Sequence, residues 1–424
     1  MDSIEIEFKD KELKESLKAN WIGSESFDKE IKDIARVPTI TTLRCNTLLY
    51  SPSICLKELP SQYLIQQHPL LKDIIEIRNT SKTTVKIHEH KEKLLIDQRC
   101  ACYVLRGASI FCKGIMASTN FIVGDTVSVY YTRRKYSNGT ILKEGDLEKE
   151  SLVLIGNGVA KMSRKDAVCA KEGVAIEMIE LFAEEAFPFS FANLSPEKFY
   201  SQNIGSSLVA HLLEVKEGEM ILDVCAAPGG KTTHLAILAN NNARIVAIDK
   251  SGKRLKLLEK TALEQSITCI ECYKGDATYE IKPGNTLKNN KKEIIFTEQM
   301  FDKIIVDPPC SSLGIKPLLG KVQTTTKEIK HLVNVQRRIL TNAFKLLKKG
   351  GLLVYSTCTI TPWENEENIR YSVDSIGMKL VKPKIVLVPP VFNSVLSEDE
   401  AKCVQRIELS SNYNGFFVAL FTKH

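Results

Sequence analysis

The sequence predicts an α/β protein with a doubly wound, mostly parallel sheet in its C-terminal part, preceded by a small β-rich domain and an α+β segment. Three patterns support this prediction. Beyond about residue 190, strand-like and helical runs alternate, as in βαβ units of a parallel sheet. Residues 91–187 hold short strand-like runs separated by glycines, and residues 1–90 mix helical and strand-like patterns. We therefore expect three parts, 1–90, 91–187 and 188–424.

The first two parts are predicted from short runs. Residues 1–90 open with a charged helical pattern, continue with the strand-like TTLRCNTLLY (41–50), and suggest a helix around LKDIIEIR (71–78). In the β-rich part, the strand-like runs are LLIDQRCACYVLRGASIF (94–111), FIVGDTVSVYYTRR (121–134) and SLVLIGNGVA (151–160). Glycines punctuate these runs, which indicates a small β-domain.

The C-terminal part shows the clearest alternation. Its predicted strands are MILDV (220–224), RIVAID (244–249), TCIECY (268–273), DKIIVD (302–307), GLLVYS (351–356) and GFFVALF (415–421). Between the fourth and fifth strands, apolar residues at helical spacing predict a long helix that begins with a capping box of Thr325 and Glu328. After the fifth strand, Thr361 and Glu364 predict a second capping box. The pattern as a whole predicts a Rossmann-like sheet.

Composition excludes several classes of protein. No apolar run is long enough to cross a bilayer, and the charged N-terminus lacks the apolar core of a signal peptide, so we expect a cytoplasmic protein without membrane contact. The net charge of +7 weakly indicates a polyanionic partner. The 12 cysteines are scattered, and Cys269–Cys272 has no second pair to complete a zinc site. We expect reduced thiols, no metal and a monomer.

Polar or glycine-rich residues follow five consecutive predicted strands. In open parallel sheets the ligand crevice lies beyond the carboxyl ends of the strands, so these residues should meet in space. In strand order they are Cys225, Ala226, Ala227, Pro228, Gly229, Gly230 and Lys231; Asp249; Asp276; Asp307 and Cys310; and Cys358. Glycines permit close approach of the backbone to a ligand, and the acidic residues can accept hydrogen bonds from ribose and adenine. Together they predict a nucleoside-binding site.

A P-loop is the main competing interpretation of the first of these loops. Gly230-Lys231-Thr232 matches the end of G-x-x-x-x-G-K-[ST], and the strand ending at Asp307 resembles one that carries a magnesium-binding aspartate. However, the first glycine of the pattern falls at Cys225, and Pro228 lacks an N–H that a phosphate cradle would use. These mismatches disfavour a P-loop NTPase.

Cys310 and Cys358 each follow a strand and open toward the same predicted crevice. A thiolate can attack carbon 6 of a pyrimidine and make carbon 5 nucleophilic toward a methyl donor, after which a second group must remove the carbon-5 proton. We expect a following helix start and Lys231 to lower the pKa of Cys358, and Asp307 to bond N3 or the exocyclic amine of cytosine. A core thiol is the alternative, but the flanking residues are polar.

Six motifs follow one another in the C-terminal part: YSQNIGSSLVA (200–210), ILDVCAAPGGKTTHLA (221–236), VAIDKS (246–251), GDAT (275–278), FDKIIVDPPCSSLG (301–314) and LLVYSTCTITPWENEENI (352–369). They strongly resemble the Sun-domain RNA cytosine-5 methyltransferases. The resemblance implies a seven-stranded methyltransferase domain with a C-terminal β-hairpin and S-adenosyl-L-methionine as cofactor. It implies that Cys358 attacks the base, that Cys310 serves product release, and that Lys231 and Asp307 contact the base. Residues 225–231, Asp249, Arg254, Asp276 and Asp307 would hold the cofactor.

The β-rich part carries CYVLRGASIFCKGIMAS (102–118), FIVGDTVSVY (121–130) and VLIGNGVAKMSRKD (153–166), which resemble a PUA domain. TLRCNTL (42–48) is similar to the family's N-terminal RNA-recognition-like segment. This architecture implies the branch of the family that acts on transfer RNA, with a target cytosine just 5′ of the discriminator base and the PUA domain on the CCA end. Single-stranded ends suit such readers because their bases are accessible.

The residues expected to contact RNA are Arg106, Arg133, Arg134, Lys135 and Asn157. A solvated surface is the alternative for the basic run, whereas phosphate contacts would make binding weaken with salt. The main alternative function is a non-catalytic RNA-binding protein that keeps the fold. The intact set of Asp307, Cys310 and Cys358 argues against it.

Overall fold

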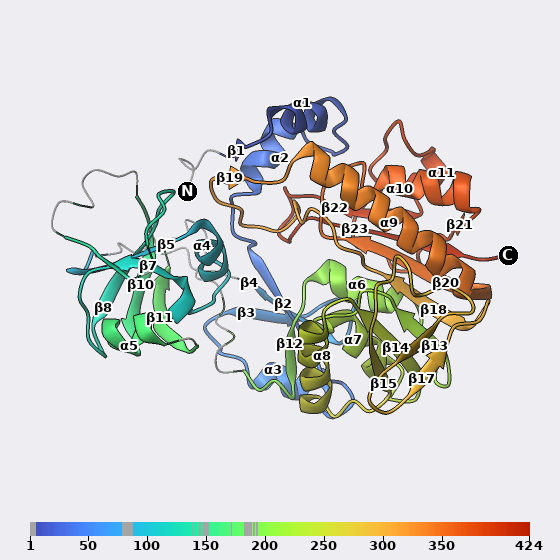
Figure 1. The fold of residues 1–424 in the computed structure, drawn as a ribbon, viewed down its shortest axis with the longest axis horizontal. Coiled ribbons are helices and arrows are strands. Elements are labelled where there is room, and N and C mark those ends of the chain that lie inside the picture. Colours follow the sequence, from blue (N-terminus) through green and yellow to red (C-terminus); the bar gives the residue numbers. More distant parts are fainter. Residues whose placement is uncertain are drawn as a thin grey trace.

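The computed structural model describes residues 6–78, 88–137, 139–143, 146, 152–170, 172–181, 189, 191 and 194–424. In Figure 1 a β-domain lies on the left, N-terminal elements (blue) lie in the middle, and a sheet covered by helices lies on the right. Among the described residues, no helix combines the length and the apolar character needed to span a membrane.

The C-terminal sheet is a mixed, eight-stranded sheet. Its order is β15 (Ile270–Lys274), β14 (Arg244–Asp249), β13 (Met220–Asp223), β18 (Phe301–Val306), β20 (Leu347–Thr357), β23 (Phe416–Thr422) and β21 (Lys379–Leu380), and β22 (Val404–Ile407) also pairs with β23. The first five strands are parallel, and β23 is antiparallel to β20 and to β22. This confirms the predicted doubly wound sheet and its C-terminal hairpin.

Helices cover both faces of this sheet (Figure 1). They are α6 (Ile204–Leu212), α7 (Gly230–Leu238), α8 (Gly252–Glu264), α9 (Thr326–Leu346), α10 (Glu366–Tyr371), the π-helical turn Ser372–Ile376 and α11 (Glu398–Ala401). Successive residues of a strand point to opposite faces: Leu222 packs with Leu340 of α9, whereas Ile221 packs with Leu208 of α6. Two apolar cores therefore sandwich the sheet.

The two predicted capping boxes have different outcomes. Thr325 and Glu328 form the capping box that begins α9. The second prediction is wrong, because α10 begins only at Glu366 and its N-cap residue Asn365 makes no side-chain cap. Glu364 therefore lies in the turn before α10, and its carboxylate takes part in the site described below.

Residues of the insertion at 282–292 form part of a small hairpin of β16 (Thr286–Lys288) and β17 (Glu293–Ile295).

The β-domain is a seven-stranded sheet with a main apolar core and a second, smaller apolar cluster. Its order is β6 (Ile110–Phe111), β11 (Val174–Leu181), β10 (Val153–Ala160), β8 (Thr126–Tyr131), β5 (Glu92–Ile96), β7 (Ile115–Ser118) and β9 (Thr140–Ile141). Two short helices, α4 (Gln98–Val104) and α5 (Arg164–Cys169), and a 3-10 turn at Cys112–Gly114 connect the strands. The predicted boundary at 187/188 lies outside the described residues, and the three segment bounds stay predictions.

The N-terminal part forms a second, four-stranded antiparallel sheet. Its order is β12 (Phe199–Ser201), β2 (Ile40–Cys45), β4 (Ile74–Arg78) and β3 (Leu64–Gln67). The remaining elements are α1 (Lys11–Ala19), α2 (Phe27–Asp33), α3 (Pro52–Lys57) and β1 (Glu7–Phe8), which pairs with β19 (Lys321–Val322). The predicted helix at 71–78 is wrong: it is strand β4, whose buried isoleucines lie between two partner strands. Since β12 precedes α6, this sheet is built partly from the chain that enters the C-terminal sheet.

Candidate active site

The carboxyl ends of β13, β14, β18 and β20 lie side by side, because these strands are parallel and adjacent. The register pairs Val306 with Tyr355, which brings the following residues, Asp307 and Ser356, next to each other. Ser356 Oγ donates to Asp307 Oδ1 at 2.7 Å. The predicted convergence of strand ends is thus present, and the loops after these strands surround one site.

The loop after β13 runs directly into helix α7. Gly229 is its N-cap residue at φ +110°, and a Cβ there would lie 2.7 Å from Leu258 Cγ of α8. Only glycine therefore satisfies both the backbone and the packing. Thr232 Oγ1 donates to the buried Asp223 at 2.8 Å, and burial raises the pKa of Asp223 to about 7. The start of α7 is held close to the end of β13.

A cavity of about 200 Å³, partly open to solvent, lies beside this loop. Its lining consists of Tyr200, Ser201, Gln202, Asn203, Ser206, Asp223, Cys225, Ala226, Ala227, Pro228, Gly230, Lys231 and Asp307. Most of the loop predicted to hold the cofactor therefore faces this cavity, together with Lys231 and Asp307.

Two further predicted cofactor residues lie at the end of β14 and in the first turn of α8. Asp249, at the end of β14, accepts the N–H groups of Ala227 at 3.2 Å and Ser251 at 2.8 Å, one on each oxygen. Each oxygen keeps lone-pair capacity for a hydroxyl, so the carboxylate fits a ribose. Arg254 donates to the Ala227 carbonyl and lies 3.5 Å from Asp249. The predicted cofactor loop and its acidic partner are thus one connected structure.

Asp276 follows β15 and is tied to its own turn. Its Oδ1 accepts from Thr278 N at 2.9 Å and from Thr278 Oγ1 at 2.6 Å, and Lys250 Nζ lies 3.0 Å from Oδ2. Burial works against ionisation, but these hydrogen bonds and the Lys250 charge outweigh it and lower the pKa of Asp276. The carboxylate is therefore ionised at neutral pH and suited to accept from an amino group.

The two predicted catalytic cysteines face each other. Their Sγ atoms are 3.4 Å apart, and Ser312 Oγ lies 3.5 Å from Cys358 Sγ and 3.9 Å from Cys310 Sγ. Both side chains are half-buried. The thiols thus share one partly open site and are not sealed in an apolar interior.

The two thiols differ in their ease of ionisation. The pKa of Cys358 is lowered, chiefly because Cys310 donates a hydrogen bond to it, with help from Ser312 and Lys231 against burial and the charge of Asp307. The same hydrogen bond, together with burial, holds the pKa of Cys310 well above its usual range. The predicted helix dipole plays no part, because α10 starts eight residues beyond Cys358.

Lys231 and Asp307 form an ion pair next to the thiols. Lys231 Nζ lies 2.7 Å from Asp307 Oδ2 and 5.6 Å from the centre of the Phe416 ring. Burial alone would lower the pKa of Lys231, but the charge of Asp307 and its hydrogen bond raise it. A fixed cation therefore stands near the Cys358 thiolate, as predicted.

Sequence reasoning missed the group that joins the two cysteine loops. Glu364 is fully buried. Its Oε1 accepts from Ser311 N and Gln336 Nε2, both at 2.9 Å, and its Oε2 accepts from Ser311 Oγ at 2.6 Å and Thr361 Oγ1 at 2.7 Å. Ser311 also bonds Thr359 Oγ1 at 2.6 Å. The Glu364 carboxylate thus holds the loop of Cys310 against the loop of Cys358.

Two of the predicted RNA-contacting residues are used inside the protein. Asn157 is fully buried, and its amide bonds Ser128 Oγ, the His88 carbonyl and Glu180. In this conformation it offers nothing to an RNA, so that prediction is wrong. Arg106 donates to the carbonyls of Lys316 at 2.7 Å and Pro317 at 3.2 Å, which joins the β-domain to the C-terminal part.

The basic run is exposed. Arg133 lies 2.9 Å from Glu7 Oε1, Arg134 stacks 5.4 Å from the ring of Tyr136, and Lys135 is solvent-exposed. Contact of these residues with RNA stays a prediction.

All 12 cysteines are free thiols. Within the described ranges, the group of side chains close enough to share a metal ion is Asp73, His211 and His234, and no cysteine belongs to it.

Comparison with known proteins identifies the fold and family. The family described as 16S rRNA methyltransferase RsmB/F matches residues 210–422, half of the chain. The chain belongs to the RsmB/F methyltransferase family. A PUA domain matches residues 92–182, which confirms the predicted identity of the β-domain. The family membership confirms the Sun-domain methyltransferase resemblance.

The most informative relatives of this family member cover most of the chain. It is 33% identical to the human tRNA (cytosine(72)-C(5))-methyltransferase NSUN6, over 91% of this chain and 83% of the relative. It is 30% identical to the tRNA (cytosine(72)-C(5))-methyltransferase of Pyrococcus horikoshii, over 90% of each chain. The crystal structure of NSun6 from Pyrococcus horikoshii with SFG matches with a TM-score of 0.77, at 28% identity over 98% of both chains. The similarity therefore extends through all three parts.

Proposed function

We propose that this protein is an S-adenosylmethionine-dependent methyltransferase that methylates carbon 5 of a cytosine at the acceptor end of transfer RNA. The observation that carries the proposal is the thiol pair, 3.4 Å apart, beside the Lys231–Asp307 ion pair at the ends of adjacent strands. The names of the relatives that cover nearly the whole chain support the substrate and the position of the cytosine.

The cofactor is held by the loop 225–231 and the carboxylates of Asp249 and Asp276. The related Pyrococcus structure contains SFG, an analogue of S-adenosylmethionine. When bound, S-adenosylmethionine supplies an electrophilic methyl group. The loop offers backbone N–H groups at the start of α7, and Asp249 offers acceptors for ribose hydroxyls, as the lone-pair count above allows.

Cys358 is the nucleophile because it is the thiol with the lowered pKa. Its thiolate forms a bond to carbon 6 of the cytosine, and the electrons of the carbon 5–carbon 6 double bond make carbon 5 nucleophilic. Carbon 5 would then take the methyl group from the bound cofactor, which would leave as S-adenosylhomocysteine. Asp307 accepts a hydrogen bond from the 4-amino group of the cytosine, and Lys231 fixes Asp307 in place.

Cys310 is the base that releases the product. In the resting site the hydrogen bond to Cys358 and the charge of its thiolate both raise the pKa of Cys310. Bond formation at carbon 6 removes that charge, so the pKa of Cys310 falls toward its ordinary value at the step where a base is needed. Cys310 then loses its own proton to water, and its thiolate takes the proton from carbon 5. The double bond re-forms, and the Cys358 sulfur leaves.

The PUA domain binds the single-stranded CCA end, while the terminal base pair opens to let the cytosine reach the thiols. A terminal pair costs less to open than an internal one, because it is stacked on one side only. The exposed run 133–135 supplies phosphate contacts. We further expect the protein to be cytoplasmic and monomeric. Light scattering of the purified protein would measure its molar mass and so test the monomer.

Tritiated S-adenosylmethionine and a transfer RNA transcript test the function. We expect label to enter the wild-type reaction, bisulfite sequencing to locate it at the acceptor-end cytosine, and Cys358→Ala to abolish transfer. Full activity in Cys358→Ala, or no transfer by wild type despite RNA binding, would contradict the proposal; the second result would favour the non-catalytic alternative. Calorimetry with ATP tests the P-loop alternative, which the Lys231–Asp307 pair and the family disfavour.

A further inference from the structure

A buried arginine of the N-terminal sheet lies directly behind the wall of the cavity. Arg44 on β2 is fully buried, and its ring neighbour Tyr200 lies 4.8 Å from the guanidinium. One guanidinium nitrogen donates to Gln202 Oε1 at 2.8 Å and to the Gly230 carbonyl at 2.5 Å. The other donates to Thr233 Oγ1 at 2.9 Å and to Gln265 Oε1 at 3.0 Å. A single side chain thus joins β12, the start of α7 and the end of α8.

Three of the residues that Arg44 contacts line the cavity: Tyr200, Gln202 and Gly230. Arg44 itself is not part of the lining. Its bond to the Gly230 carbonyl fixes the first turn of α7, while Leu258 packs against the adjacent Gly229 from the side of α8. The loop is therefore held between α8 and the N-terminal sheet.

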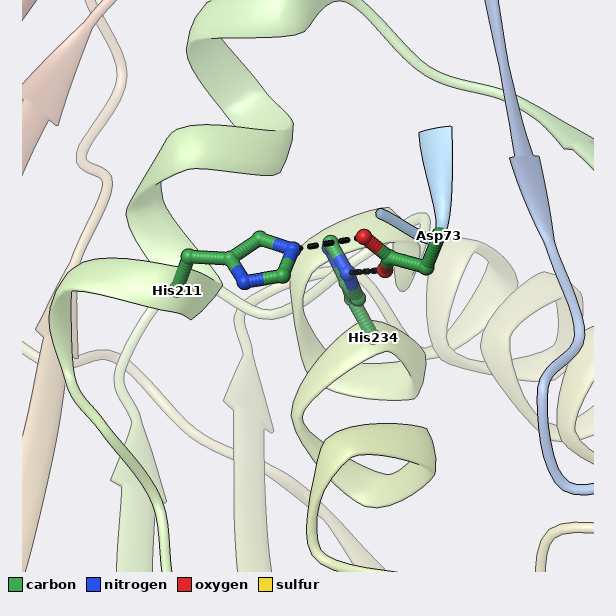
Figure 2. Close-up of side chains that lie close together, drawn as sticks. All are labelled: Asp73, His211 and His234. Carbon is green, nitrogen blue, oxygen red and sulfur yellow. Dashed lines mark hydrogen bonds and ion pairs between the residues drawn. The ribbon is translucent and has the colours of Figure 1, made fainter. Parts of the chain in front are cut away.

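A second contact from the N-terminal part reaches the same helix. Figure 2 shows the carboxylate of Asp73 facing the rings of His211 of α6 and His234 of α7, with an interaction to each. Asp73 Oδ1 lies 2.7 Å from His211 Nε2, and Oδ2 lies 2.5 Å from His234 Nε2. Burial lowers the pKa of His234 to about 4, so its ring is neutral at pH 7 and donates its Nε2–H to the carboxylate.

Hydrogen bonding explains this cluster better than metal binding. Tetrahedral zinc with ligand bonds of about 2.0–2.1 Å would hold ligand atoms roughly 3.3 Å apart. The two nitrogen–oxygen distances are 2.5 and 2.7 Å, which are hydrogen-bond lengths. Asp73 therefore acts as an acceptor that ties α6 and α7 to the N-terminal sheet.

We infer that Arg44 and Asp73 are positioning residues for the cofactor site, so that the N-terminal sheet sets the affinity for S-adenosylmethionine. The inference rests on the proposed role of loop 225–231. The backbone N–H groups at the start of α7 can bind a ligand only while the first turn of the helix keeps its position. Arg44, which belongs to the N-terminal sheet, holds this turn in position. The arginine of TLRCNTL, the motif similar to the family's N-terminal RNA-recognition-like segment, thus contributes to the cofactor site of the C-terminal domain.

The direct test is the dissociation constant of S-adenosylhomocysteine, measured by calorimetry without RNA. We expect Arg44→Met to weaken binding at least tenfold. Arg44→Lys should restore little of it, because an ammonium cannot reach four acceptors on separate elements. Arg78→Met is the matched control, since Arg78 lies exposed on β4 of the same sheet. Its affinity should stay within twofold of wild type.

Asp73→Asn is the second variant, because it keeps the size of the side chain. It tests the inference even if Arg44→Met does not fold. We expect severalfold weaker binding, since the amide offers one acceptor where two N–H groups need one each. Hydrogen exchange of the α7 amides supplies a readout that needs no ligand, and both variants should exchange faster there. Folded variants with wild-type affinity and unchanged α7 exchange would overturn the inference. A wild-type protein that does not bind S-adenosylhomocysteine would instead overturn the proposed function.

Discussion

Replacing Glu364 by alanine removes four hydrogen bonds, and the two from Ser311 join the two cysteine loops. The hydroxyls of Ser311 and Thr361 can turn toward other acceptors, but the Ser311 N–H and one Gln336 N–H would be left buried without a partner. An unsatisfied buried donor costs about 1–3 kcal/mol, so the loss of stability should be about 2–6 kcal/mol. The loops would also lose the contact that keeps the sulfurs together.

Glu364→Gln removes the negative charge of the side chain but keeps its size and its ability to make the four hydrogen bonds. The amide oxygen can replace Oε1 and keep both N–H bonds, and the NH₂ group can donate to the Ser311 and Thr361 hydroxyls. We expect kcat to fall only a few-fold in Glu364→Gln. In Glu364→Ala we expect a fall on the order of a hundredfold, the effect of an error of about 1 Å in a reacting group. The Michaelis constants of both substrates should stay within threefold of wild type.

The assay pairs steady-state methyl transfer with formation of a Cys310–Cys358 disulfide by the oxidant diamide, followed by mass spectrometry. Glu364→Ala should slow this disulfide, while alkylation of the exposed Cys169 stays unchanged. Glu30→Ala is the matched control, because Glu30 is also fully buried but bonds the backbone of Leu409 and Ser410. A folded Glu364→Ala enzyme with wild-type kcat and cross-linking rate would refute the reasoning, as would an equal loss of kcat in Glu30→Ala.

Four further outcomes are expected. Because the pKa of Cys358 is lowered and that of Cys310 is raised, iodoacetamide should alkylate Cys358 at lower pH than Cys310. Cys310→Ala removes a hydrogen bond to the Cys358 thiolate worth ~1.5 kcal/mol, so alkylation of Cys358 at pH values below its pKa should be about tenfold slower. An unchanged alkylation rate would contradict the hydrogen bond between the two thiols. Asp307→Asn should lower kcat by about 10²–10³-fold in the tritium assay, and wild-type turnover would exclude its contact with the base. Asp249→Ala should weaken S-adenosylhomocysteine at least tenfold by calorimetry; equal affinity would remove Asp249 from the cofactor site. Lys135→Ala should reduce the slope of log K against log[salt] for RNA by about one, and an unchanged slope would place this residue away from phosphate.

Much of the fold and the site could be predicted because it depends on local patterns. The alternation of strands and helices determines a parallel sheet, and a parallel sheet places the ends of its strands together. Asp307 and Cys310 after one strand, and Cys358 after the next, therefore had to converge. The 3.4 Å between the sulfurs follows from that topology with one further contribution, the bridge through Glu364.

The errors concern side chains whose partners are distant in sequence. Glu364 matched a capping box with Thr361, but its carboxylate bonds Ser311, 53 residues away, and the helix begins later. Asn157 was expected to contact RNA, yet a strand on each side of β10 buries it. Residues 74–78 have no clean period and become a strand because β2 and β3 flank them. Hydrophobic periodicity predicts the helix or strand to which a residue belongs, but it does not predict which other element packs over that residue.

Arg44 shows the same limit most clearly. Its motif was visible in the sequence, but its four acceptors lie on segments between 158 and 221 residues away. A fully buried arginine is rare. The two terminal nitrogens of Arg44 make all four of these hydrogen bonds, whereas its buried Nε has no hydrogen-bond partner among the described residues. Nothing in the local sequence distinguishes such a residue from a surface arginine that contacts RNA.

The measurement that tests the central claim most directly is covalent trapping. Cys310→Ala is incubated with S-adenosylmethionine and a transfer RNA transcript, denatured, and separated by electrophoresis. The proposed division of labour predicts a protein–RNA adduct that survives denaturation, carries a 5-methylated cytosine on Cys358, and disappears in Cys310→Ala/Cys358→Ala. Normal product release by Cys310→Ala, or an adduct that persists in the double variant, would show that the two thiols do not act as described.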